Sequence, residues 1–351
     1  MSISSPTASS QTSLMTRAVQ SGNGFLGDFI SNIQIDRLPE ILTSIQKTIQ
    51  ERTKNLFQEH LKDLPSGICL ATTGSDARAE KADRDSPMEI IVINSSEDES
   101  KESKPVHFSA KPPLSSSIKT VKAVLEQFPE QFDPRIEIKD LENRANPLTF
   151  VNEKDPKTRF IPTRAIDAIP IFGDDSAFTR YQKEASEKLL KTNAREKKKF
   201  YTDQVKPAEI ELQSCLNGQS ASVNLKTGEL TYDPDKRLKS VKYGLLRCIQ
   251  YKLAYALIEA VQAGKILSSI LLAAPKPVAE KIAFLQEKKI LDLSEQEASE
   301  LVSVYQQVNQ WYVVSQIKHQ NGIKKTYVDP NELTQSAHTI EKFFSKKNII
   351  K

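Results

Sequence analysis

Apolar residues recur every three to four positions across residues 38–61. This spacing is typical of an amphipathic helix. Asp36 is a suitable N-cap before the pattern, and Pro65 lies just beyond it. The pattern therefore predicts one long helix between these two residues.

Two short apolar segments follow, at residues 68–73 and 88–93, and both are rich in strand-forming residues. The polar stretch 74–87 separates them. We therefore expect a strand, a loop and a second strand, with the loop as the place for chemistry, because functional residues concentrate in loops held by a rigid scaffold.

The next 80 residues repeat the mixture of helix and strand signals. Residues 115–128 carry apolar positions on one helical face, and residues 135–141 alternate like a strand exposed on one side. A helix or turn is then expected to lead to the apolar residues 169–172, before Gly173.

After Asp174 the pattern becomes mainly helical. A short hairpin around Gly228 is expected within residues 221–231. The helical patterns cover residues 178–200, 241–263, 279–289 and 294–320. The fold class predicted is thus an α+β domain over residues 36–178, followed by an all-α helical bundle domain over residues 179–351.

Residues 1–35 are expected to be a disordered tail, because the first 24 are rich in Ser and Thr and carry no charge before Arg17. They lack the basic and apolar regions of a secretory signal peptide. Two interpretations stay open: an ordinary disordered terminus, or a type III secretion signal, which has this uncharged, Ser-rich composition.

Composition excludes several classes of function. The 351 residues allow about two domains. With 49 Lys and Arg against 45 Asp and Glu, the net charge of +4 gives no case for a nucleic-acid binder. No apolar stretch approaches the roughly 20 residues that span a bilayer, so no membrane partner is expected. The three separated cysteines indicate reduced thiols in a cytoplasmic protein, without a disulfide framework or a zinc site.

The polar loop opens with Gly74 and Ser75, and continues with Arg78 and Glu80. Backbone N–H groups exposed at a Gly-Ser turn near a helix start are suited to binding phosphates. Together with the following strand, this segment resembles the nucleotidyltransferase fold of the DNA polymerase beta superfamily, whose pattern is G-S-x-x-R-x-E followed by S-D-x-D at the head of a strand.

The resemblance extends to bacterial protein uridylyltransferases with a helical substrate-binding domain. The segments that carry it are residues 172–178 (FGDDSAF), 242–247 (KYGLLR), 301–320 with Tyr305, His319 and Gln320, and 328–333 (VDPNEL). It implies a nucleoside triphosphate as substrate, Mg²⁺ as cofactor and a protein as acceptor or partner.

In that family, the two Asp of S-D-x-D and a third carboxylate hold two Mg²⁺ ions. Here Pro87 stands at the first Asp position and Glu89 at the second, and proline offers no ligand atom. Asp83 and Asp85 lie just upstream as substitutes, and Glu137 is the candidate third ligand. The resemblance thus implies catalytic roles for Glu89, Asp85 and Glu137, metal binding by these three and Asp83, and phosphate binding by the Gly-Ser turn and its arginine.

Each candidate also has an ordinary structural interpretation. Asp83 and Asp85 are equally typical of solvated loop charges, Glu89 of an outward-facing strand residue, and Glu137 of an exposed position on an edge strand. Arg78 and Glu80 either form an ion pair that holds the loop, or Arg78 contacts phosphate. The leading hypothesis is metal-dependent nucleotidyl transfer to a hydroxyl on a protein. The alternative is a catalytically inactive relative that serves as a binding or scaffold module.

Overall fold

The computed structural model describes residues 38–64, 66–80, 88, 90–94, 120–121, 123–124, 127, 166–191, 194–219, 223–231, 239–320 and 325–345. Three described strands form one antiparallel sheet in the order β2-β1-β3: β1 (Ile68–Thr72), β2 (Ile90–Asn94) and β3 (Ile169–Gly173). The expectation that the segments around residues 68–73 and 88–93 are neighbouring strands is confirmed.

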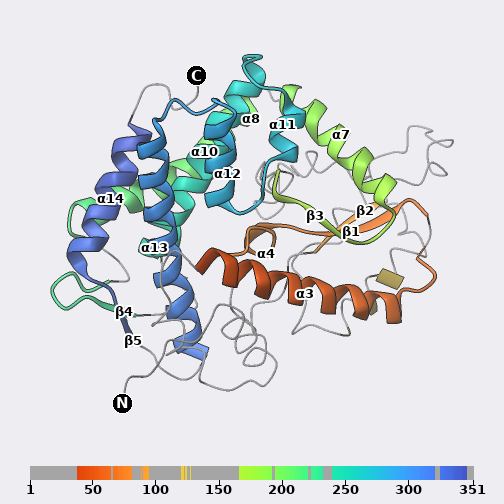
Figure 1. Ribbon diagram of the computed structural model, residues 1–351, viewed down its shortest axis with the longest axis horizontal. Coiled ribbons are helices and arrows are strands. Elements are labelled where there is room, and N and C mark those ends of the chain that lie inside the picture. Colours follow the sequence, from red (N-terminus) through yellow and green to blue (C-terminus); the bar gives the residue numbers. More distant parts are fainter. Residues whose placement is uncertain are drawn as a thin grey trace, which may run out of the picture.

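Helices cover both faces of this sheet (Figure 1). Helix α3 (Leu38–His60) packs Phe57 against one face, together with Ile68 and Leu70 of β1. Helix α7 (Asp175–Lys191) covers the other face, where its Phe178 shares a cluster with Cys69. Every residue of β1 is buried, because alternate side chains of this central strand enter the two apolar layers.

Residues 166–167 are helical, in keeping with a helix or turn that leads to the apolar residues, whereas residues 169–173 form the strand β3, which was not expected. Its pairing with β1 shifts register between Leu70 and Ala71, opposite Pro170 and Phe172. Proline cannot donate to a strand ladder. The irregular pairing accommodates Pro170 within the strand. A proline inside an apolar segment argues against a strand in the sequence.

Beyond the sheet, the described chain is almost entirely helical. Helix α13 (Glu295–Gln320) matches the predicted segment closely, and the single helix expected over residues 241–263 contains a π-helical first part. The other helical elements are α8 (Ala194–Phe200), the π-helical η5 (Tyr201–Val205), α9 (Lys206–Leu216), η6 (Lys239–Leu246), α10 (Arg247–Gln262), α11 (Ser268–Ala273), α12 (Val278–Glu287) and α14 (Pro330–Phe344).

The hairpin around Gly228 is present in outline, since Val223 bridges Leu230 across the turn. The longer pairing joins β4 (Glu229–Thr231) to β5 (Lys325–Tyr327), almost 100 residues away. Nearest-neighbour patterns along the chain could not show this pairing.

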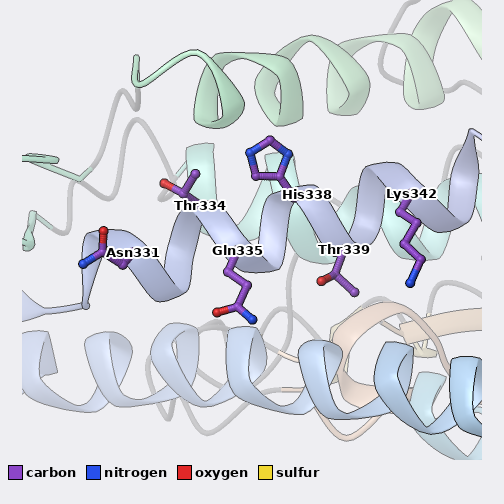
Figure 2. A pocket seen from close by; sticks show the side chains of 6 residues that line it. All are labelled: Asn331, Thr334, Gln335, His338, Thr339 and Lys342. Carbon is purple, nitrogen blue, oxygen red and sulfur yellow. The ribbon is translucent and has the colours of Figure 1, made fainter.

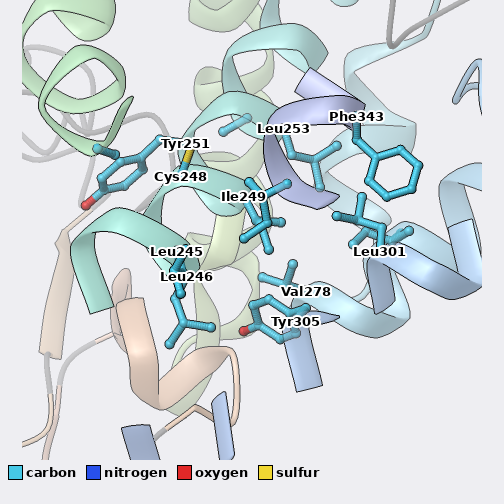
Figure 3. Close-up of a cluster of buried hydrophobic side chains, with 14 of the residues drawn as sticks. Leu245, Leu246, Cys248, Ile249, Tyr251, Leu253, Val278, Leu301, Tyr305 and Phe343 are labelled. Atoms are coloured by element: carbon cyan, nitrogen blue, oxygen red, sulfur yellow. The ribbon is translucent and has the colours of Figure 1, made fainter. Parts of the chain in front are cut away.

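The helices share one large apolar core, to which Leu245, Val278, Leu301 and Phe343 all belong. Figure 3 shows Tyr305 among these side chains. Among the described residues, no helix is long and apolar enough to span a membrane.

Candidate functional site

The Gly74-Ser75 turn leaves the end of β1 and enters the four-residue helix α4 (Gly74–Ala77). Gly74 has φ +70°, a conformation that glycine adopts without strain. The turn closes with hydrogen bonds from Arg78 N to Gly74 O (3.2 Å) and from Glu80 N to Ser75 O (3.0 Å). Gly74 and Ser75 stay partly exposed, while residues 77–80 are buried.

The start of β2 lies beside this turn. Thr72 at the end of β1 pairs with Ile90 at the beginning of β2. Met88, two residues earlier, is buried in the apolar layer under α3. The polar loop therefore leaves β1 and enters β2 at the same end of the sheet.

Arg78 is buried in ion pairs, with 3% of its surface exposed. Its Nε lies 3.0 Å from Glu80 Oε1, and its Nη1 lies 2.7 Å from Asp167 Oδ2. The structure thus shows the ion-pair alternative for Arg78 and Glu80. A phosphate contact through this guanidinium would compete with two carboxylates that already hold it.

Three helical elements contribute further partners to this ion pair. Gln250 of α10 and Tyr305 of α13 both donate to Glu80 Oε1, and Arg247 donates from Nη1 to Gln250 Oε1 at 2.7 Å. Lys281 of α12 lies 2.7 Å from Asp167 Oδ1. We call six of these side chains the junction network: Arg78, Glu80, Asp167, Gln250, Lys281 and Tyr305.

All six side chains are buried, so water screens the interactions between their charges only weakly. Burial by itself lowers the pKa of Arg78, yet Glu80 and Asp167 outweigh burial and raise that pKa above its ordinary value. Burial likewise acts to raise the pKa of Asp167, but Lys281 and Arg78 lower it overall. Arg78 and Asp167 are therefore both charged at neutral pH.

The hydroxyl of Tyr305 stays protonated, because burial and the charge of Glu80 raise its pKa well above the ordinary value. It therefore acts as a hydrogen-bond donor to that carboxylate. Its ring meanwhile belongs to the apolar core of the helices. One side chain thus ties the turn after β1 to the middle of the bundle.

A small cavity of about 20 Å³ adjoins the junction network. Arg78, Asp167, Gln250 and Lys281 form its polar lining, and the remaining lining residues are apolar. The Nη2 atom of Arg78 is buried and has no hydrogen-bond partner among the described residues. The volume suits about one water molecule and is too small for a nucleotide.

Lys276, which lies just before α12, binds next to the junction network. Its Nζ donates to the carbonyls of Ile166 and Leu272, each at 2.7 Å. Burial and the nearby charge of Lys281 lower the pKa of Lys276 to about 8. Two lysines, Lys276 and Lys281, thus lie close together beside Asp167 of the junction network.

Asp174 fixes the other end of β1. Its carboxylate accepts hydrogen bonds from Ser176 N (2.8 Å) and Gly67 N (2.7 Å). The Ser176 side chain, together with these two N–H groups, lowers the pKa of Asp174 to about 2. Gly173 beside it has φ +105°, and an added Cβ would lie 2.3 Å from Ile68 O. The Gly-Asp segment quoted in the sequence therefore locks the start of β1 to α7.

The proposed metal ligands Asp83, Asp85, Glu89 and Glu137 all lie outside the described residues. Within the described part of the chain, no group of three or more His, Cys, Asp or Glu side chains could hold a metal ion. The metal site therefore stays a prediction.

The sequence interpretation missed three members of the junction network: Asp167, Gln250 and Lys281. A signal for two of them was present. Gln250 and Lys281 stand among apolar neighbours in helices that bury those neighbours. A polar residue at such a position needs a partner, but the sequence does not reveal which residue supplies it.

A second hollow, of about 550 Å³, follows α14 (Figure 2). Its lining consists of polar residues three or four positions apart on this single helix: Asn331, Thr334, Gln335, His338, Thr339 and Lys342. None of them belongs to the junction network. The described lining residues offer hydroxyl, amide, imidazole and ammonium groups, and no carboxylate.

Comparison with known proteins assigns the chain to no family. No family model matches it, and a search of curated proteins finds no significant relative.

Proposed function

We propose that the protein has a nucleotidyltransferase fold and transfers a nucleotidyl group from a nucleoside triphosphate to a hydroxyl on a protein acceptor. The observation that carries the proposal is the Gly74-Ser75 turn at the end of a buried strand, directly beside the start of β2. Gly74 and Ser75 are partly exposed, and Asp83 and Asp85 follow them closely in the sequence.

In this reaction the turn binds the triphosphate through backbone N–H groups and the Ser75 hydroxyl. The acceptor oxygen forms a bond to the α-phosphorus, the bond to the β-phosphate breaks, and pyrophosphate and the hydroxyl proton leave. Arg78 then shapes the turn, because its guanidinium is already paired with Glu80 and Asp167.

Carboxylate oxygens are the ligands that Mg²⁺ prefers, so Asp83, Asp85, Glu89 and Glu137 have the right chemistry to hold it. Mg²⁺ would neutralise the charge that develops on the transferred phosphate and the leaving pyrophosphate. Pro87 supplies no ligand atom at the position where the resembled family has an aspartate, so the site depends on the neighbouring carboxylates.

The test is incubation of the protein and a cell lysate with each labelled triphosphate and Mg²⁺ or Mn²⁺. We expect label on a protein band, and loss of that label in Glu89→Gln but not in Glu287→Gln, a surface carboxylate of α12. Absence of transferred label from the unmodified protein, together with no triphosphate binding by calorimetry, would refute the proposal.

A second candidate is a non-catalytic binding module with the same fold. Two observations favour it: Pro87 replaces a metal ligand, and the one arginine of the turn is held by buried carboxylates. Two-metal chemistry tolerates little error in ligand geometry. Triphosphate binding without transfer of label under any metal condition would select this candidate.

A further inference from the structure

The turn after β1 includes a strained residue whose conformation needs support. Ala79 has φ +54°, which costs a residue with a side chain about 1–2 kcal/mol. Helix α3 supports the turn through Gln46, whose Nε2 donates to Ala77 O at 3.0 Å. The side chains on either side of Ala79, those of Arg78 and Glu80, are held by the other members of the junction network.

Those partners lie far away in the sequence. Glu80 is held by Gln250 and Tyr305, which are 170 and 225 residues distant. Lys281 reaches Arg78 through Asp167, whose two carboxylate oxygens are shared between the two cations. Three separate helices, α10, α12 and α13, thus each contribute one side chain to the hold on the turn.

We propose that Gln250, Lys281 and Tyr305 are positioning residues for the Gly74-Ser75 turn, so that its occupancy by phosphate groups is coupled to the arrangement of α10, α12 and α13. The coupling to phosphate rests on the proposed function of the turn. Because binding linkage is reciprocal, a protein partner that shifts these helices changes triphosphate affinity, and the triphosphate changes partner affinity by the same factor.

The test compares Tyr305→Phe with Tyr312→Phe by amide hydrogen exchange. Both tyrosines are buried in α13, but Tyr312 lies outside the junction network and its hydroxyl accepts from Gln316. A hydrogen bond to a buried charge contributes roughly the free energy of a tenfold change in an equilibrium constant or more. We therefore expect the amides of Arg78 and Glu80 to exchange about tenfold faster in Tyr305→Phe, and at an unchanged rate in Tyr312→Phe.

A purely structural role of Tyr305 would accelerate exchange throughout the bundle in Tyr305→Phe. Selective acceleration at residues 74–80 supports positioning, and uniform or absent acceleration overturns it. Gln250→Leu provides an independent second variant, which removes the donor that α10 contributes to Glu80 and should show the same selective effect.

The second measurement is triphosphate affinity by calorimetry, with ATP, UTP, GTP and CTP in turn. We expect at least about fivefold weaker binding in Tyr305→Phe and unchanged binding in Tyr312→Phe. If the unmodified protein binds none of the four, the proposed function fails, while the exchange rates still decide whether the helices position the turn. If it binds a triphosphate and both variants bind equally well, the coupling is refuted.

Discussion

Replacing Asp167 with Asn tests whether the junction network is organised by charge. Asp167 is 2% exposed and pairs with Arg78 and Lys281, each at 2.7 Å. The substitution keeps the shape of the side chain but leaves two buried cations facing a single carboxylate, Glu80. Breaking a buried ion pair by removing one partner costs about 3–5 kcal/mol.

This loss is a large part of the roughly 5–15 kcal/mol that stabilises a typical domain. We expect the urea midpoint to fall accordingly and the thermal midpoint to drop by roughly 10 °C. The matched control is Glu287→Gln in the exposed Lys288–Glu287 pair, at 3.4 Å, which should change stability by less than about 0.5 kcal/mol.

Adding Lys281→Met to Asp167→Asn should recover part of the lost stability, because it removes one of the buried charges that Asp167→Asn leaves without a partner.

The pKa of Asp167 is lowered in the folded protein from 3.8, so its stabilising effect is present above that pH and is lost as the pH falls below it. The stability gap between the unmodified protein and Asp167→Asn should therefore narrow in acid. A loss below about 1 kcal/mol at pH 7, or no recovery in the double variant, would show that charge does not organise the junction network.

Three further predictions concern the sheet and the bundle core. Gly173→Ala should lower the free energy of unfolding by at least about 2 kcal/mol in urea titration, because it adds a steric clash to a backbone conformation with positive φ. The control Gly264→Ala has φ +71° and open space around the added Cβ, so it should cost only about 1 kcal/mol. For Asp174, hydrogen bonds from the Ser176 side chain and from the N–H groups of Gly67 and Ser176 lower the pKa to about 2, so its stabilisation is present above the ordinary carboxyl pKa and is lost toward pH 2. Asp174→Asn should flatten that part of the stability curve measured by circular dichroism. Phe343→Ala should cost about 3–5 kcal/mol in the same urea titration, because the ring is fully buried; a loss under about 1 kcal/mol would contradict its place in the core.

Local pattern predicted much of the described secondary structure, although the helices α9 and α14 were not expected. The apolar spacing across residues 38–61 and 294–320 predicted the two longest described helices, because a helix that packs against a core repeats its apolar residues about every 3.6 positions. The two short apolar runs predicted β1 and β2, because strands buried on both sides read as continuous apolar segments. The same reasoning failed at β3, where Pro170 interrupts the strand signal.

The sequence also identified the Gly74-Ser75 turn as the candidate for phosphate chemistry, and it left two roles open for Arg78. That Arg78 and Glu80 form a buried ion pair is visible in the folded protein alone, because their partners Asp167, Gln250 and Tyr305 come from distant parts of the chain. A charged residue looks the same in the sequence whether it faces solvent or a buried partner. Its environment is set by which helices pack over it, and that packing depends on the whole fold rather than on neighbouring residues.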